Sequence, residues 1–369
     1  MKSALGLYIH IPFCKAKCAY CDFYSLARSE ERMDAYAAAL QASLRSSAPA
    51  AADYAVDTVY FGGGTPTFFG AARLAALLET VWNCYAIAPN AEITFEANPE
   101  SARDADALRT LRIAGFNRIS LGMQSANDAE LRAIGRIHTA ADTISAVEAA
   151  RRAGFGNLSL DLIYGLPAQT RGRWRENLAA AVSLAPEHLS CYGLKVEPGT
   201  PLYTRRSSAS LPDDDAQADL YLDAVDYLAA QGYAQYEISN FAKPERESRH
   251  NLKYWTLGEY LGFGPGAHSD FGGRRFAAAR DLDAFLEGRG AYSEDADISP
   301  RERAAERVML GLRLKRGLPA AELIGAESVL NACAAHGLAE QIGENWRLTP
   351  QGFLVSNTVI VQVQEALGL

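Results

Sequence analysis

The chain has 369 residues, of which 49% are hydrophobic and 22% charged, and its formal net charge is −8. This globular composition contains no run of about 18 apolar residues, which excludes a membrane span, and the acidic balance disfavours a nucleic-acid partner. Residues 1–12 lack the charged and apolar regions of a signal peptide, and the six cysteines do not form a disulfide framework, so we expect a reducing, cytoplasmic location.

The first predicted element is an apolar strand, Leu5–Ile11, and a group of three cysteines follows it directly. Cys14, Cys18 and Cys21 have the spacing C-x3-C-x2-C. Thiolates suit an iron–sulfur cluster, zinc or Cu(I). Three thiolates leave one iron of a four-iron cluster free for a small chelating molecule, whereas a structural zinc site normally takes four protein ligands. A zinc site and three unrelated buried thiols stay open as alternatives.

Strand-like and helix-like stretches alternate along the next part of the chain. One helix-like stretch, Ser29–Ser47, has apolar residues at helical spacing. The alternation predicts an α/β fold with a parallel sheet and crossover helices. The strand-like runs are Leu5–Ile11, Val56–Gly62, Glu92–Asn98, Arg118–Ser125, Asn157–Gly165 and His188–Glu197.

A short internal repeat supports this alternation. Ala114-Gly115-Phe116 precedes the fourth strand-like run, and Ala153-Gly154-Phe155 precedes the fifth, 39 residues later. Glycine can take the left-handed position that ends a helix, and the aromatic residue then leads into a strand. A capping pair, Thr139 with Asp142, predicts the start of the helix that Gly154 ends.

Polar or glycine-rich residues occur near the carboxyl ends of most of these runs. In a parallel α/β sheet or barrel the ligand lies at that end. The residues concerned are the cysteine loop, Gly62–Pro66, Glu96, Gln124–Ser125 and Lys195–Gly199, with Asp161 in mid-strand as the loosest fit. The sequence therefore predicts one site at the carboxyl ends of the strands.

Several residues of this site have side chains suited to binding a charged small molecule. The run Gly62–Thr65 can present backbone N–H and C=O groups to a ligand, although a tight turn explains it as well. Glu96 and Asp161 can accept hydrogen bonds from an ammonium or a hydroxyl group of a ligand. Asp161 lies in an apolar strand and needs a partner when buried, and a structural arginine is the alternative to a ligand. The planar fork of Arg136 suits a carboxylate, and an ordinary surface arginine is the alternative. Gln124 can bridge polar groups or simply satisfy backbone groups of the barrel, and Tyr8 and Tyr20 flank the cysteines as ligand contacts or as core residues.

The segment His250-Asn251-Leu252-Lys253-Tyr254-Trp255 places a histidine near two aromatic residues. This combination suits ligation and stacking of a flat macrocycle such as heme. A capping histidine above a core Tyr/Trp pair explains the same residues at least as well.

The character of the chain changes after Ile298. Ser299-Pro300-Arg301-Glu302 is a capping box with proline at the first helical position. Two helical stretches and a hairpin around Gly343–Asn345 follow, a pattern that resembles a winged helix. Seven Lys and Arg balance seven Asp and Glu here, so the basic surface needed for DNA is missing. We predict three parts: 1–232, 233–297 and 298–369.

The cysteine spacing resembles that of radical S-adenosylmethionine (SAM) proteins. Together with Gly62–Thr67, Asp161–Pro167 and the C-terminal segment, it makes essentially the whole chain resemble the oxygen-independent coproporphyrinogen III oxidase family. The resemblance implies a partial (β/α)6 radical SAM barrel with an accessory segment and a C-terminal winged-helix-like domain. It implies a [4Fe–4S] cluster on Cys14, Cys18 and Cys21, and a SAM site lined by Tyr8, Tyr20, Gly63, Gly64, Thr65, Glu96, Gln124, Arg136 and Asp161.

Two features depart from the oxidases and resemble the HemW branch of heme chaperones. Phe23 stands where the oxidases carry a further cysteine, and Cys14 lies close to the start, where the oxidases have an extension. This resemblance, with the His250 motif, implies heme binding and transfer to heme-accepting proteins such as respiratory enzymes. It also implies a flavodoxin- or ferredoxin-like one-electron donor, and is compatible with peripheral membrane contact and a homodimer. Oxidative decarboxylation of coproporphyrinogen III, or radical SAM chemistry on another substrate, are the alternatives.

Overall fold

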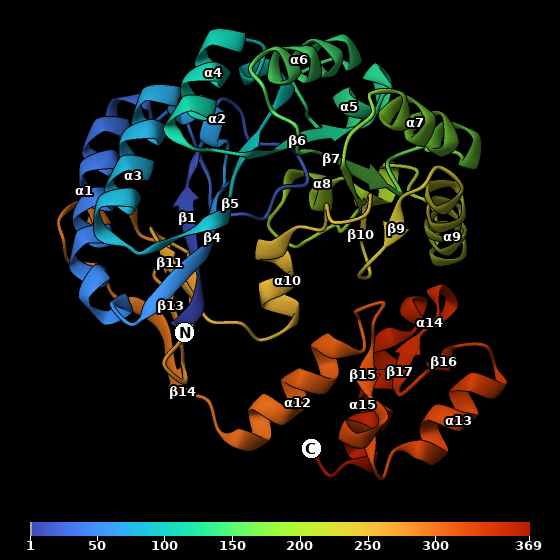
Figure 1. The fold of residues 1–369 in the computed structure, drawn as a ribbon. Coiled ribbons are helices and arrows are strands. Elements are labelled where there is room, and N and C mark those ends of the chain that lie inside the picture. Colours follow the sequence, from blue (N-terminus) through green and yellow to red (C-terminus); the bar gives the residue numbers. More distant parts are fainter. Residues whose placement is uncertain (1) are drawn as a thin grey trace.

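The computed structural model describes residues 2–369. One large mixed sheet forms the centre of the molecule, helices surround it, and a smaller region at the C-terminal end packs below it (Figure 1). The strand order in the large sheet is β14-β13-β12-β11-β1-β4-β5-β6-β7-β8-β10-β9. The α/β fold class predicted from the alternation is therefore confirmed.

Six strands in sequence order form the parallel middle of this sheet. They are β1 (Ser3–Ile11), β4 (Tyr54–Gly63), β5 (Ile87–Ala97), β6 (Arg118–Gln124), β7 (Leu158–Tyr164) and β8 (His188–Gly193). Each pairs in parallel with the next. All six predicted strand-like runs are thus confirmed, and their carboxyl ends meet at the same edge, as expected for a parallel sheet.

The connecting helices cover the outer face of these strands (Figure 1). They include α1 (Met33–Ser47), α3 (Ala71–Cys84), α4 (Ala105–Ala114), α6 (Ala140–Arg152) and α7 (Arg171–Ser183). Thr139 and Asp142 form the predicted capping box of α6. Gly115 and Gly154 both take positive φ values, 119° and 92°, directly before strands β6 and β7, which confirms the structural meaning of the repeat.

The two faces of the parallel strands differ because successive side chains point to opposite sides. Along β6, Ile119, Leu121 and Met123 belong to the main hydrophobic core beneath the helices. The alternate residues Ser120 and Gln124 line a cavity on the other face. An apolar outer face and a polar inner face are what place a ligand site inside the curved sheet.

The sheet extends beyond the six predicted strands on both sides. Strand β11 (Tyr260–Phe263) pairs in parallel with β1, and β12 (His268–Phe271), β13 (Arg274–Ala278) and β14 (Tyr292–Asp297) continue outward as antiparallel strands. On the other side, β10 (Asn240–Ala242) and β9 (Ala234–Gln235) follow β8. The sequence analysis did not predict these strands, which are short, and β14 is exposed along its whole length.

The C-terminal region has its own small sheet and its own hydrophobic core. It consists of α12 (Pro300–Gly311), β15 (Leu318–Pro319), α13 (Glu327–Ala335), β16 (Ala339–Ile342), β17 (Asn345–Leu348), α14 (Pro350–Leu354) and α15 (Ser356–Ala366). The predicted capping box of Ser299 and Glu302 opens α12, and β16 and β17 form the predicted hairpin. The division of the chain into three parts stays a prediction.

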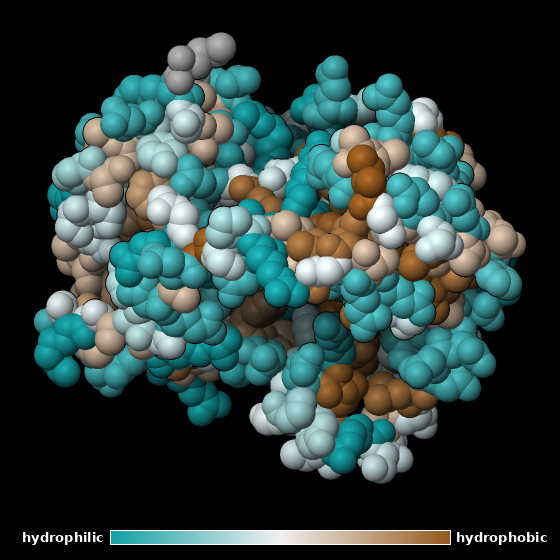
Figure 2. Space-filling model, turned by 90° about the horizontal axis from the view of Figure 1, so that it is seen from below, coloured by the Kyte–Doolittle hydropathy of each residue, from teal (hydrophilic) through white to brown (hydrophobic). Residues whose placement is uncertain are grey.

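The surface seen from below mixes hydrophilic side chains with smaller groups of hydrophobic ones (Figure 2). Within residues 2–369, no helix combines the length and the apolar character needed to cross a bilayer.

Candidate functional site

A cavity of about 650 Å³ lies on the inner face of the parallel strands. Its size is within the range of small-molecule and cofactor sites. Most of the predicted site residues line it: Cys14, Cys18, Cys21, Tyr20, Gly63, Gly64, Thr65, Glu96, Gln124, Arg136 and Asp161. Tyr8 and His250 are the two predicted residues that do not.

The three cysteines lie together at the edge of the cavity near the carboxyl ends of the strands. Cys14 is buried at the end of β2 (Phe13–Cys14), whereas Cys18 and Cys21 are half-buried in the following loop. Burial raises the pKa of the Cys14 thiol, although a hydrogen bond from Thr65 acts in the opposite direction, and burial also raises the pKa of Cys21. A metal centre would therefore bind by displacing protons from these thiols.

The arrangement of the thiols bears on the zinc alternative. Among residues 2–369, no three His, Cys, Asp or Glu side chains converge as ligands of a single metal ion. A four-iron cluster needs no such convergence, because each thiolate binds a different iron. The number and spacing of the cysteines, three in one loop, match the donor set of an open cluster.

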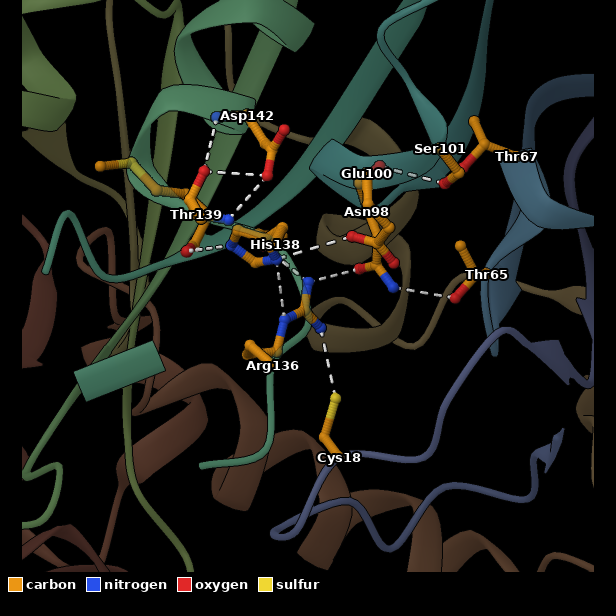
Figure 3. A network of polar contacts seen from close by, with 12 residues as sticks. Cys18, Thr65, Thr67, Asn98, Glu100, Ser101, Arg136, His138, Thr139 and Asp142 are labelled. Atoms are coloured by element: carbon orange, nitrogen blue, oxygen red, sulfur yellow. Dashed lines mark hydrogen bonds and ion pairs between the residues drawn. The ribbon is translucent and has the colours of Figure 1, made fainter. Parts of the chain in front are cut away.

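Arg136 connects the cysteine loop to the carboxyl end of β6 (Figure 3). Its Nη1 donates to Cys18 Sγ at 3.5 Å, its Nη2 donates to Asn98 Oδ1 at 2.7 Å and to the Gly122 carbonyl at 2.9 Å, and its Nε donates to His138 Nδ1 at 3.3 Å. Four of its five N–H groups are therefore used within the protein. The predicted two-point clamp on a carboxylate is not available in this arrangement.

Asn98 and Thr65 continue this network (Figure 3), and Thr65 extends it to a second cysteine, Cys14. Asn98 Nδ2 donates to Thr65 Oγ1 at 2.9 Å, and Thr65 Oγ1 donates to Cys14 Sγ at 3.5 Å. Cys14 and Cys18 thus receive side-chain hydrogen bonds from the protein, of the kind that tune a cluster. Sequence reasoning missed Asn98, although its place at the end of a predicted strand was a usable signal.

Glu96, on β5, also lines the cavity. Its carboxylate accepts hydrogen bonds from the Tyr60 hydroxyl at 2.9 Å and from the Gly63 amide at 3.0 Å. Burial raises the pKa of Glu96 to about 7, and the nearby Asp161 carboxylate raises it further against the effect of these hydrogen bonds. Such a carboxyl group changes charge near neutral pH and favours a cationic ligand when ionised.

Asp161 has two serines as partners instead of the arginine considered from the sequence. Ser190 donates to it at 2.8 Å, and Ser120 lies at 3.2 Å from both carboxylate oxygens. Burial raises the pKa of Asp161, and these hydrogen bonds oppose the rise. Its cavity-lining position leaves the carboxylate able to accept from ligand hydroxyl groups.

The glycine run has a different role from the one predicted. The amides of Gly63, Gly64 and Thr65 are all used within the protein, by Glu96, by the Ile11 carbonyl and by the Phe13 carbonyl. These N–H groups are therefore not free for a ligand, whereas ligand contacts of the C=O groups in this run stay a prediction. Glycine is required because a Cβ at position 64 would lie 2.8 Å from the Ile11 and Phe13 carbonyl oxygens.

A second glycine, Gly122, was missed. A Cβ at this position would lie 2.9 Å from Gln124 Nε2, 3.0 Å from Asn98 Oδ1 and 3.2 Å from Arg136 Nη2. Gln124 itself has a φ of 61°, unusual for a residue other than glycine, which turns the end of β6 toward the cavity. Gly122 thus makes the space in which three cavity-lining polar groups meet.

His250 and Tyr8 lie outside the cavity lining. His250 is 1% exposed in α10 (Arg249–Trp255), with Nδ1 at 2.9 Å from the Thr58 hydroxyl and Nε2 at 2.8 Å from the Tyr254 hydroxyl. Burial lowers the pKa of His250 to about 3. Both ring nitrogens are engaged, so heme ligation would require α10 to rearrange. The neighbouring Asn251 is the residue of this motif that lines the cavity.

Two family models match the chain. The radical SAM superfamily matches residues 8–181, and the HemN C-terminal domain matches residues 298–355. The heme chaperone HemW of Mycobacterium tuberculosis is 38% identical over 365 residues, covering 96% of this chain and 93% of its own length. The heme chaperone HemW of Escherichia coli is 37% identical over 370 residues, covering 96% and 97%.

A solved structure supports the same grouping. Coproporphyrinogen III oxidase (HemN) from Escherichia coli, a radical SAM enzyme, superimposes with a TM-score of 0.85 at 25% identity, covering 98% of this chain and 90% of that one. Fold, cysteine loop and cavity define a radical SAM protein, a class whose domain implies a [4Fe–4S] cluster and SAM. Within that class, the chain belongs to the heme chaperone HemW family.

Proposed function

We propose that this protein binds heme and transfers it to heme-accepting proteins on a radical SAM scaffold. The observation that carries the proposal is the identity of 36–38% to heme chaperones over nearly the whole chain. Phe23 supports it. This side chain is 69% exposed beside the cysteine loop, and it stands where the resemblance to the oxidases would place a further cysteine.

The cofactor site follows from the same proposal. Cys14, Cys18 and Cys21 would hold a [4Fe–4S] cluster, which supplies a low-potential electron to SAM when bound. Glu96 and Asp161 would bind the cationic and hydroxyl groups of SAM. The SAM site would be completed by Tyr20, Gly63, Gly64, Thr65, Gln124 and Arg136. Arg136 would act by positioning Asn98 and Cys18, and Tyr8 would support the site by packing against the cavity-lining Tyr60.

His250 is also the proposed heme ligand, on one structural condition. Heme ligation by His250 needs the bonds to Thr58 and Tyr254 to be replaced. The one-electron donor, flavodoxin- or ferredoxin-like, would meet the exposed rim of Lys15, Lys17 and Phe23 around the cluster loop. A cytoplasmic location suits both the donor and an oxygen-sensitive cluster.

The test is a heme titration of the anaerobically reconstituted protein, followed by mixing with an apo-hemoprotein. We expect stoichiometric heme uptake and transfer to the acceptor. The His250→Ala variant should show an altered heme spectrum, whereas His268→Ala, which removes an exposed histidine, should not. Absence of heme uptake would refute the chaperone function, and an unchanged spectrum in His250→Ala would refute only the ligand assignment.

A second function, oxidative decarboxylation of coproporphyrinogen III, is favoured by one observation, the TM-score of 0.85 to HemN. An anaerobic assay with reductant and SAM distinguishes the two. Formation of protoporphyrinogen would establish the oxidase activity, whereas heme transfer without it supports the chaperone.

A further inference from the structure

Arg118 is a buried cation without a direct partner. It is the first residue of β6, it lines the cavity, and it is 2% exposed. Within residues 2–369 its guanidinium makes no hydrogen bond and no ion pair, and its buried Nε has no partner. Burying a charge without compensation is costly. A guanidinium in this state, directed into a cavity, indicates a place for an anion.

Two carboxylates interact electrostatically with Arg118, but neither is its bonded partner. Glu96 and Asp161 feel the charge of Arg118, which lowers the pKa of each, but neither forms an ion pair with it. Their oxygens are bonded to Tyr60, Gly63, Ser120 and Ser190. A cationic SAM bound at these two carboxylates would leave Arg118 with still less compensation.

SAM itself does not supply the anion. Its one anionic group is the methionine carboxylate, which would bind the iron that the three cysteines leave free. Arg136 marks that end through its bonds to Cys18 and the Gly122 carbonyl. Arg118 precedes Gly122 by four residues, about 13 Å further down an extended strand. The partner of Arg118 must therefore come from another molecule.

The walls of the cavity include hydroxyl and amide groups that suit a small polar ligand. Ser239, Tyr192 and Asn251 line it together with Arg118. A guanidinium presents paired N–H groups whose geometry matches a carboxylate. Hydroxyl and amide groups can complete the hydrogen bonds of such an anion.

We propose that Arg118 anchors a second subsite, below the SAM site, that binds the carboxylate of a separate small molecule. The carboxylate comes either from a free small carboxylic acid or from a propionate side chain of a tetrapyrrole. The second source rests on the proposed heme function, and the first does not.

The test uses sodium propionate as the probe on the reconstituted, SAM-saturated protein. Saturation-transfer difference NMR should detect propionate and not propionamide, its neutral analogue of the same shape. Arg118→Gln should weaken propionate binding at least about tenfold, as expected for hydrogen bonds to a charged group. The matched control is Arg109→Gln, which removes an exposed arginine on α4 and should leave binding unchanged. SAM binding at pH 8 should persist in both variants.

Three results would overturn the subsite. They are equal signals from propionate and propionamide, equal propionate binding in Arg118→Gln and Arg109→Gln, or loss of the propionate signal when SAM saturates the protein. If Arg118→Gln does not fold, Arg118→Lys keeps the charge without the fork and should still weaken propionate binding.

Hemin and its dimethyl ester distinguish the two sources. The carboxylate belongs to the tetrapyrrole if two results occur together. Wild type binds the dimethyl ester more weakly than hemin, and Arg118→Gln binds hemin more weakly than wild type does. If neither esterification of hemin nor Arg118→Gln changes the affinity, the subsite binds a separate acid and the heme proposal stays intact.

Discussion

Arg136 donates an N–H group to the sulfur of Cys18 at 3.5 Å, across 118 residues of sequence. The same guanidinium bonds Asn98 and the Gly122 carbonyl, so it fixes the cysteine loop relative to the ends of β5 and β6. Arg136 is therefore a positioning residue that couples the cluster loop to the proposed SAM site.

Replacing Arg136 should weaken both parts of that site. We predict that Arg136→Gln lowers the affinity for iron during anaerobic reconstitution by about 10- to 100-fold, the usual effect of losing an outer hydrogen-bond partner. Iron and sulfide content at limiting iron measures this. Arg132→Gln, which removes a nearby exposed arginine, should behave as wild type. Arg136→Lys should fall between the two, and full cluster loading of Arg136→Gln would contradict the positioning role.

The central strands and the cysteine loop were predictable because strong local patterns specify them. β6 is apolar at alternate positions, and Cys14, Cys18 and Cys21 lie within one loop. The hydrogen-bond network of Arg136 was not predictable, because its partners come from β5, β6 and the cysteine loop. Only the fold brings Asn98, Gly122 and Cys18 to one guanidinium.

Gly122 offers a steric test of the same network. We predict that Gly122→Ala lowers SAM affinity about tenfold and costs about 1–3 kcal/mol of unfolding free energy, the usual range for overpacking. The physical reason is that the new Cβ would lie within 3.2 Å of groups on Gln124, Asn98 and Arg136. SAM titration and urea unfolding provide the two measurements.

The control for this substitution is Gly156→Ala, because a Cβ at Gly156 meets nothing within 4 Å. It should leave SAM affinity and stability near the wild-type values. Equal behaviour of the two alanine variants would show that the space at Gly122 is not needed for the ligand.

His250 should make stability depend on pH. Burial lowers its pKa to about 3, so the folded state keeps it neutral while the unfolded chain binds a proton below about pH 6.5. Its contribution is therefore complete above pH 6.5 and falls by about 1.4 kcal/mol per pH unit below it. Other buried groups titrate as well: the pKa of His10 is lowered by burial to about 4, and that of Glu237 is raised by burial to about 7.

Comparing wild type with His250→Gln isolates this one group. At pH 7.5 the variant should be less stable by about 2–4 kcal/mol, because Thr58 and Tyr254 lose their buried partner. At pH 5.5 the deficit should shrink by about 1.4 kcal/mol, because glutamine does not titrate. Urea unfolding at both pH values measures it, with His268→Gln as the exposed control. A deficit independent of pH would contradict a neutral buried imidazole.

The role of α10 could not be read from its motif. His, Tyr and Trp at this spacing suit a heme ligand or a core cap, and local sequence does not distinguish the two. Thr58 decides where the ring points, and it lies 192 residues away in β4. The strands β11–β14 were missed for a related reason: they are short, and pairing with β1 and with one another defines them.

Glu96 should make SAM binding depend on pH near neutrality. Burial raises its pKa to about 7, so a large fraction is protonated below that value in the ligand-free protein. A cationic ligand favours the ionised form, and binding below pH 7 must therefore displace a proton. We predict that the dissociation constant for SAM is constant above about pH 8 and rises as the pH falls, by at most about tenfold per unit for this one group.

Titrating SAM into the cluster-loaded protein between pH 6 and pH 8 measures this dependence. Glu96→Gln keeps one acceptor oxygen, which can face the Gly63 amide while the new Nε2 donates to the Tyr60 hydroxyl oxygen, but it cannot ionise. It should bind SAM more weakly at pH 8 and lose most of the pH dependence, with a smaller remainder from Asp161, whose pKa burial also raises. Asp106→Asn, which removes an exposed carboxylate on α4, should retain the wild-type profile. Identical slopes in wild type and Glu96→Gln would show that the charge of Glu96 is not what SAM binding selects.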